Sequence, residues 1–159
     1  VGPCVSHFKG SDARIALCAT TATIESGMYQ NAFRMIGREI IAVAIPELAG
    51  AIEAGAGDAK YDEYIRKAFA GTPSGSYDVL VLGCTHYPLA AGSFRRVIGD
   101  TLTVFDPAVA VAERVKRDLW PREMGYGKTQ FFISRDSAQF RTLAVQLFPG
   151  QEFIVEVAG

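Results

Sequence analysis

Three side chains that could take part in proton-transfer or binding chemistry, a thiol, a hydroxyl and an imidazole, follow one short apolar segment. Residues 79–82 read Val-Leu-Val-Leu, and Gly83, Cys84, Thr85 and His86 come directly after them. A short apolar run is typical of a buried strand, and glycine permits a tight turn at its end. In open α/β sheets, ligands bind where strand carboxyl ends meet helix N-termini. The stretch therefore predicts a reactive thiol at Cys84. The alternative is a buried structural cysteine, which is what most free cysteines are.

Several polar side chains elsewhere are weaker candidates. His86 is close enough in sequence to assist Cys84, and it could equally be a capping or core histidine. Thr20 and Thr23 follow another apolar run, where their hydroxyls could bind a carboxylate or simply cap a helix. Glu53 lies on a predicted helix, and a solvated carboxylate is its ordinary interpretation. Spacing alone leaves these alternatives open.

The elements that must position these residues alternate along the chain. Apolar runs predict strands at residues 14–19, 39–44, 77–82, 102–105, 129–134 and 152–157. Helices are expected after a cap at Ser26 and at residues 46–54, 59–70, 87–98, 107–119 and 136–147. Residues 1–12, 71–76 and 121–128 are expected to be loops or linkers. This alternation favours an α/β fold with a largely parallel sheet.

Composition excludes several classes of protein. Of the 159 residues, 49% are hydrophobic and 21% charged, which is ordinary for a globular chain. The net charge of −1 gives no footprint for nucleic acid, and no apolar run is long enough to span a bilayer. No signal-peptide pattern opens the chain. The three cysteines form no CxxC pair, so we expect a reducing, cytoplasmic setting and no metal site.

Two longer motifs carry a resemblance to a known family. Residues 82–89, Leu-Gly-Cys-Thr-His-Tyr-Pro-Leu, resemble the second-cysteine motif of glutamate racemase, within the aspartate/glutamate racemase superfamily. Residues 19–29, Ala-Thr-Thr-Ala-Thr-Ile-Glu-Ser-Gly-Met-Tyr, resemble the threonine-rich turn of that family. Residues 52–55, which include Glu53, and residues 105–107 also fit.

The resemblance implies a cofactor-independent enzyme that interconverts L- and D-glutamate for peptidoglycan synthesis. Two opposed cysteines would transfer the α-proton, and Cys84 would be one of them. His86 would assist it and contact substrate, and Glu53 would support the site electrostatically. Thr85, Thr20 and Thr23 would bind the glutamate. Relatives commonly form homodimers, so a homodimer without nucleic-acid or membrane partners is expected.

One departure from the family pattern limits the resemblance. The first catalytic cysteine of the family lies in a Cys-Asn-Thr motif after an early Asp-Ser pair, and neither motif occurs here. Cys4 and Cys18 sit in unrelated contexts and are interpreted as structural. The chain therefore resembles the C-terminal portion of such an enzyme. We expect a three-layer parallel-sheet domain at residues 1–103, and a segment at residues 104–159 that belongs to a second, incomplete α/β domain.

Two other functions remain open from the sequence. The first is a related aspartate racemase-type enzyme, although such enzymes resemble Gly-Cys-Thr-Glu where this chain has His86. The second is a catalytically inert α/β module that binds an amino acid or a partner protein. The reactivity of the Cys84 thiol separates an inert module from an enzyme.

Overall fold

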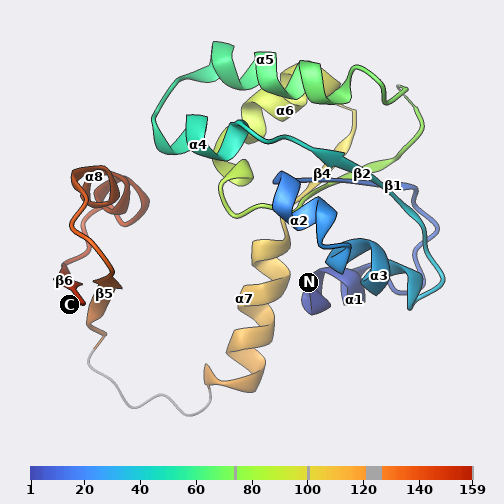
Figure 1. Cartoon of the computed structure of the whole chain (residues 1–159). Coiled ribbons are helices and arrows are strands. Elements are labelled where there is room, and N and C mark those ends of the chain that lie inside the picture. Colours follow the sequence, from blue (N-terminus) through green and yellow to red (C-terminus); the bar gives the residue numbers. More distant parts are fainter. Residues whose placement is uncertain (74, 100, 121–126, 159) are drawn as a thin grey trace. The chain divides into compact units, whose positions relative to one another are not determined.

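The computed structural model describes residues 1–73, 75–99, 101–120 and 127–158, which divide into two compact units. The first unit spans Val1–Asp118 and the second Leu119–Gly159 (Figure 1). The predicted division after residue 103 concerns a longer, two-domain protein and stays a prediction. In this chain, the strand around residue 104 pairs with the sheet of the first unit.

The first unit is built on a four-stranded parallel sheet with strand order β2-β1-β3-β4. The strands are β1 (Ile15–Ala19), β2 (Ile40–Ala44), β3 (Val79–Leu82) and β4 (Thr103–Phe105). All four were predicted within a residue or two, because each is a short apolar run. Pairing of β1 with both β2 and β3 places their carboxyl ends side by side at one edge of the sheet.

Helices cover both faces of this sheet, as parallel sheets require (Figure 1). One face carries α4, α5, η1 and α6, and the other carries α1, α2 and α3. Their bounds are α1 (Gly2–His7), α2 (Thr21–Glu25), α3 (Met28–Arg34), α4 (Leu48–Glu53), α5 (Asp58–Phe69), the 3-10 helix η1 (Tyr87–Ala90) and α6 (Ala91–Ile98). A further helix, α7 (Pro107–Asp118), contacts α1. The predicted three-layer α/β fold is confirmed.

Strand β1 is the centre of two hydrophobic cores. Its side chains alternate, with Ala16 and Cys18 in the core under α4, α5 and α6, and Ile15, Leu17 and Ala19 in the core under α1 and α3. All five side chains are buried. A strand that is buried on both faces reads as a continuous apolar run, which is why the sequence predicted it clearly.

The predicted loop at residues 1–12 is wrong, because residues 2–7 form helix α1. Its glycine and proline suggested a linker, but Pro3 lies in the first helical turn, where a missing N–H costs nothing. Cys4, Val5 and Phe8 are buried together in the second core. Tertiary packing thus stabilises a helix that local composition disfavours.

The helix expected after Ser26 is instead preceded by a separate short helix. Thr20 caps α2, and Gly27, with a φ of 64°, is the N-cap residue just before α3. The left-handed conformation at Gly27 changes the chain direction between the two helices. Similarly, the helix expected at residues 87–98 begins as the 3-10 turn η1 before α6 continues it.

The described residues of the second unit include two parallel strands and a helix between them. They are β5 (Thr129–Ile133), α8 (Ala138–Leu147) and β6 (Phe153–Val157), all close to the predicted ranges. Ser137 caps α8 by accepting a hydrogen bond from the Phe140 backbone, at 3.1 Å. The Phe131 ring lies against the rings of Phe140, Phe148 and Phe153. Residues 121–126 of the predicted loop lie outside the described residues.

Candidate active site

The carboxyl edge of the first sheet gathers the loops that carry the predicted site residues. Thr20 directly follows β1, Cys84 comes two residues after β3, and Glu53 ends α4, the helix that follows β2. The turn after β3 lies tightly against β1, because the Gly83 backbone N–H donates to the Cys18 carbonyl at 2.7 Å. A Cβ at residue 83 would lie 3.1 Å from that same oxygen, so only glycine fits without displacing a neighbour.

Cys84, His86 and Glu53 form a connected series of side chains. The Cys84 Sγ lies 3.9 Å from His86 Nδ1, and His86 Nε2 lies 2.9 Å from Glu53 Oε1. When Nε2 is protonated and donates a hydrogen bond to the Glu53 carboxylate, Nδ1 is unprotonated and faces the sulfur. In that tautomer the imidazole can accept the thiol proton, as a base oriented by a third group. The structure brings these three side chains together, and their catalytic roles stay a prediction.

Of the three cysteines, all of which lie in the described residues, Cys84 is the one that is partly exposed. Cys4 and Cys18 are fully buried. Burial raises the pKa of Cys4 to about 11, and burial also raises the pKa of Cys18 well above its ordinary range. Neither buried thiol is accessible to a substrate, which agrees with their interpretation as structural residues.

The threonines lie at the same edge, with local contacts of their own. Thr20 Oγ1 lies 3.0 Å from Thr23 Oγ1 and accepts a hydrogen bond from the Thr23 backbone N–H at 3.4 Å. Thr20 is therefore the N-cap of α2, the structural role that the sequence left open. Thr85 is exposed in the turn between Cys84 and His86. Their contact with a substrate stays a prediction.

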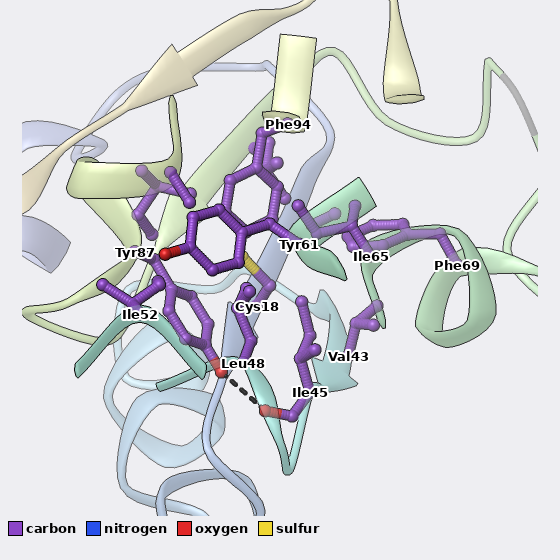
Figure 2. Close-up of a cluster of buried hydrophobic side chains, with 14 of the residues drawn as sticks. Cys18, Val43, Ile45, Leu48, Ile52, Tyr61, Ile65, Phe69, Tyr87 and Phe94 are labelled. Carbon is purple, nitrogen blue, oxygen red and sulfur yellow. Dashed lines mark hydrogen bonds between the residues drawn. The ribbon is translucent and has the colours of Figure 1, made fainter. Parts of the chain in front are cut away.

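Tyr87 is a residue of this edge that the sequence did not single out. Its side chain is fully buried, and its hydroxyl donates to the Ile45 carbonyl at 2.8 Å (Figure 2). Burial raises the pKa of this phenol. A buried tyrosine in a helical segment indicates that its hydroxyl has a hydrogen-bond partner, because a buried tyrosine hydroxyl usually has one. The partner itself, 42 residues away, was not readable from the pattern.

Two clefts occur at the opposite, amino edge of the sheet. One has a volume of about 610 Å³ and is lined by residues just before β1, β3 and β4, among them Arg14, Tyr77 and Leu102. The other, of about 440 Å³, lies beside Arg14 and Arg38. Neither cleft is lined by a cysteine or a histidine, so neither offers the proton-transfer groups found at the carboxyl edge.

The described residues hold no arrangement of three or more His, Cys, Asp or Glu side chains suited to a metal ion. In the same parts of the chain, no helix is both long enough and apolar enough to cross a membrane.

Comparison with known proteins gives a consistent result. The family model described as Asp/Glu/Hydantoin racemase matches residues 2–115. The chain is 33% identical over 141 residues to the glutamate racemase of Thermoanaerobacter sp. (strain X514), covering 84% of this chain and 53% of that protein. It is 36% identical over 115 residues to the glutamate racemase of Mycobacterium ulcerans (strain Agy99), covering 71% of this chain and 42% of that protein.

Solved structures share the fold. The glutamate racemase of Thermus thermophilus, in complex with β-chloro-D-alanine, matches with a TM-score of 0.79 and 27% identity, covering 99% of this chain and 60% of that one. Glutamate racemase isoform RacE1 from Bacillus anthracis matches with a TM-score of 0.82 at 23% identity, covering 99% of this chain and 62% of that one. The chain thus spans little more than half the length of its first curated relatives.

Proposed function

Because the chain belongs to the Asp/Glu/hydantoin racemase family, we propose that it carries one half of the proton-transfer site of a glutamate racemase. The curated relatives named above are glutamate racemases, and residues 82–89 agree with the second-cysteine motif of that group. The chain corresponds, in this proposal, to the C-terminal portion of such an enzyme. Residues 104–159 then belong with a second α/β domain.

The proposed chemistry needs no cofactor. In one direction, the Cys84 thiolate removes the α-proton of glutamate and becomes a thiol, while a second thiol donates its proton to the opposite face and becomes a thiolate. In the reverse direction, the two sulfurs exchange roles. One proton leaves carbon and one returns, so the configuration inverts and no redox change occurs. The second thiol is neither Cys4 nor Cys18, since both are fully buried.

His86 and Glu53 prepare Cys84 for this role. Glu53 holds His86 Nε2 at 2.9 Å and so orients the ring toward the sulfur. His86 Nδ1 lies 3.9 Å from Cys84 Sγ, a looser contact of the kind that commonly tightens when substrate binds. The imidazole accepts the thiol proton and generates the thiolate that attacks the α-proton. Glu53 acts here by orienting His86.

The threonines and the exposed backbone of the turn bind the substrate. An α-proton beside an ionised carboxylate is weakly acidic, so the site must stabilise developing negative charge with fixed donors. The hydroxyls of Thr20, Thr23 and Thr85 lie at the carboxyl edge that carries Cys84, where they can donate to substrate carboxylates.

We extend the proposal to a homodimer in the cytoplasm that supplies D-glutamate for peptidoglycan. The cytoplasm is a setting in which the thiols stay reduced.

The contact series from Glu53 through His86 to a partly exposed Cys84 is the observation that carries this proposal. The test is alkylation of the 159-residue chain by iodoacetamide at neutral pH, followed by mass spectrometry of each cysteine peptide. Cys84 should react on the order of 100-fold faster than Cys4 or Cys18, because reactivity follows thiolate character and exposure. A Cys84→Ser chain, as the control, should show only slow labelling.

Equal and slow labelling of all three cysteines would contradict the proposal and favour an inert amino-acid-binding module. A second measurement tests the half-site itself. The isolated chain should not convert L-glutamate to D-glutamate, because one thiol cannot serve both faces of the substrate. Measurable racemisation that disappears in Cys84→Ser would refute the requirement for a second thiol outside this chain.

A further inference from the structure

We propose that Tyr87 is a positioning residue whose buried hydroxyl ties the loop carrying Cys84 and His86 to the connection that leads to Glu53. This inference rests on the proposed role of Cys84. It adds a residue whose hydroxyl bonds to a backbone carbonyl, and which thereby fixes the distance between the elements that hold the sulfur and the carboxylate.

The hydroxyl bond joins two segments that are far apart in sequence. Tyr87 is the first residue of η1, and Ile45 lies between β2 and α4. The Tyr87 hydroxyl donates to the Ile45 carbonyl at 2.8 Å, and both residues are almost completely buried (Figure 2). Water therefore has little access to replace this bond. The Ile45 backbone N–H in turn donates to the Ala19 carbonyl at 2.9 Å, which links the same residue to the end of β1.

These bonds fix the catalytic loop at both of its ends. At one end, the Gly83 N–H donates to the Cys18 carbonyl at 2.7 Å, so the loop is tied to β1. At the other end, Tyr87 ties it to the β2–α4 connection. Cys84 and His86 lie between the two anchors. The anchor at Gly83 is made by the backbone, whereas the anchor at Tyr87 is made by a side chain and can be removed by substitution.

Helix α4 connects the Tyr87–Ile45 bond to Glu53. Leu48 and Ile52 of this helix belong to the same buried cluster as Tyr87, and α4 contacts η1 (Figure 2). Glu53 is the last residue of α4, and its carboxylate lies 2.9 Å from His86 Nε2. The 3-10 helix that begins with Tyr87 thus contacts the helix that ends at Glu53, and Tyr87 is the next residue after His86. Loosening the hydroxyl bond should widen the range of His86–Glu53 distances.

A phenylalanine would fill the same space without making this bond. The ring of residue 87 would still pack beside Phe94. The Ile45 carbonyl would lose its side-chain donor in a buried position, which disfavours the present arrangement of the two segments. The substitution Tyr87→Phe therefore removes the positioning bond and preserves the packing.

A double-mutant cycle tests the inference with the alkylation rate of Cys84 as its readout. Tyr87→Phe should slow alkylation by roughly 2- to 12-fold, the factor that corresponds to one ordinary hydrogen bond. Glu53→Gln should also slow it. In the double variant, Tyr87→Phe should hardly slow alkylation further, because Glu53→Gln has already weakened the His86–Glu53 contact that Tyr87 positions. Non-additivity of this kind indicates that the two residues act through one network.

Tyr77→Phe is the matched control, since Tyr77 is a buried tyrosine of the same cluster that lies just before β3, at the opposite edge. It should leave the Cys84 rate unchanged in both backgrounds. Circular dichroism should confirm that every variant is folded. Independently of any variant, the Tyr87 hydroxyl proton of the wild-type chain should exchange slowly with solvent in NMR spectra.

Two results would overturn the inference while leaving the proposed function intact. They are a Tyr87→Phe effect that is equal with and without Glu53→Gln, and a rapidly exchanging Tyr87 hydroxyl in a chain whose Cys84 reacts fast. Slow alkylation of Cys84 in the wild-type chain is a different outcome. It would remove the proposed function, and the inference with it.

Discussion

The two edges of the first sheet differ in what they bring together. At the carboxyl edge, the turn after β3 and the end of α4 place a partly exposed thiol, an imidazole and a carboxylate in series. At the amino edge, two clefts of about 610 and 440 Å³ surround an ion pair between Arg14 and Asp78. These two clefts therefore lack the proton-transfer groups found at the carboxyl edge.

The ion pair at the amino edge is a structural clamp. Arg14 Nε and Nη2 donate to the two Asp78 carboxylate oxygens at 3.0 and 2.6 Å, and its Nη1 donates to the Gly75 carbonyl at 2.6 Å. Each of these guanidinium nitrogens already has a partner within the protein. At the carboxyl edge, by contrast, the Cys84 sulfur lies at the end of its contact series and remains partly exposed. The two clefts thus draw attention to the amino edge, whereas side-chain chemistry favours the carboxyl edge.

The largest expected effect separates the two edges by reactivity. His86→Ala should slow alkylation of Cys84 by about 10- to 100-fold, because it removes the base that takes the thiol proton in the proposed mechanism. Arg66→Ala, at the amino-edge cleft, should leave the rate unchanged. Both rates are read from mass spectra of the Cys84 peptide over time. A similar loss in both variants would mean that the rate reports general loosening of the fold rather than the action of His86.

The sequence predicted the strands of both units because they are short, largely apolar runs that include β-branched residues. It failed at α1, where Gly2 and Pro3 suggested a linker and the buried Phe8 reveals a packed helix. Local composition cannot show that a short segment has a hydrophobic partner elsewhere.

The site was predictable to a similar degree. Cys84 and His86 are adjacent to one strand end, so their proximity could be inferred from the pattern. The place of Glu53 beside His86 depended on resemblance to a family, since it requires the packing of α4 against η1. The bond from Tyr87 to Ile45 spans 42 residues and follows from strand order, which the local pattern does not contain.

Gly83→Ala should have the next largest effect. A Cβ at this position would lie 3.1 Å from the Cys18 carbonyl oxygen and 3.2 Å from Ala19 Cβ, so it would crowd the turn after β3 against β1. Overpacking of this kind costs about 1–3 kcal/mol in the free energy of unfolding. Chemical denaturation should show the loss. Gly71→Ala, where a Cβ would have no neighbour within 4 Å, should change stability by no more than about 0.5 kcal/mol.

If both glycine variants were equally stable, the carboxyl-edge turn would have room to move away from β1. The constraint on the Cys84 backbone would then be weaker than the structure indicates.

The smallest expected effect concerns the clamp at the amino edge. The hydrogen bonds from Arg14 lower the pKa of Asp78 to about 2, from an ordinary value of 3.8. A depressed carboxyl pKa adds stability that is fully present above the unfolded value and is lost as the pH falls through the folded one. The thermal midpoint of the wild-type chain should therefore exceed that of Asp78→Asn at pH 6. The difference should shrink between pH 4 and pH 2, and 0.5 M NaCl should reduce it at pH 6, because the pair is exposed. A difference in thermal midpoint that stayed constant down to pH 2 would show that the charge of Asp78 adds nothing to the stability of the clamp.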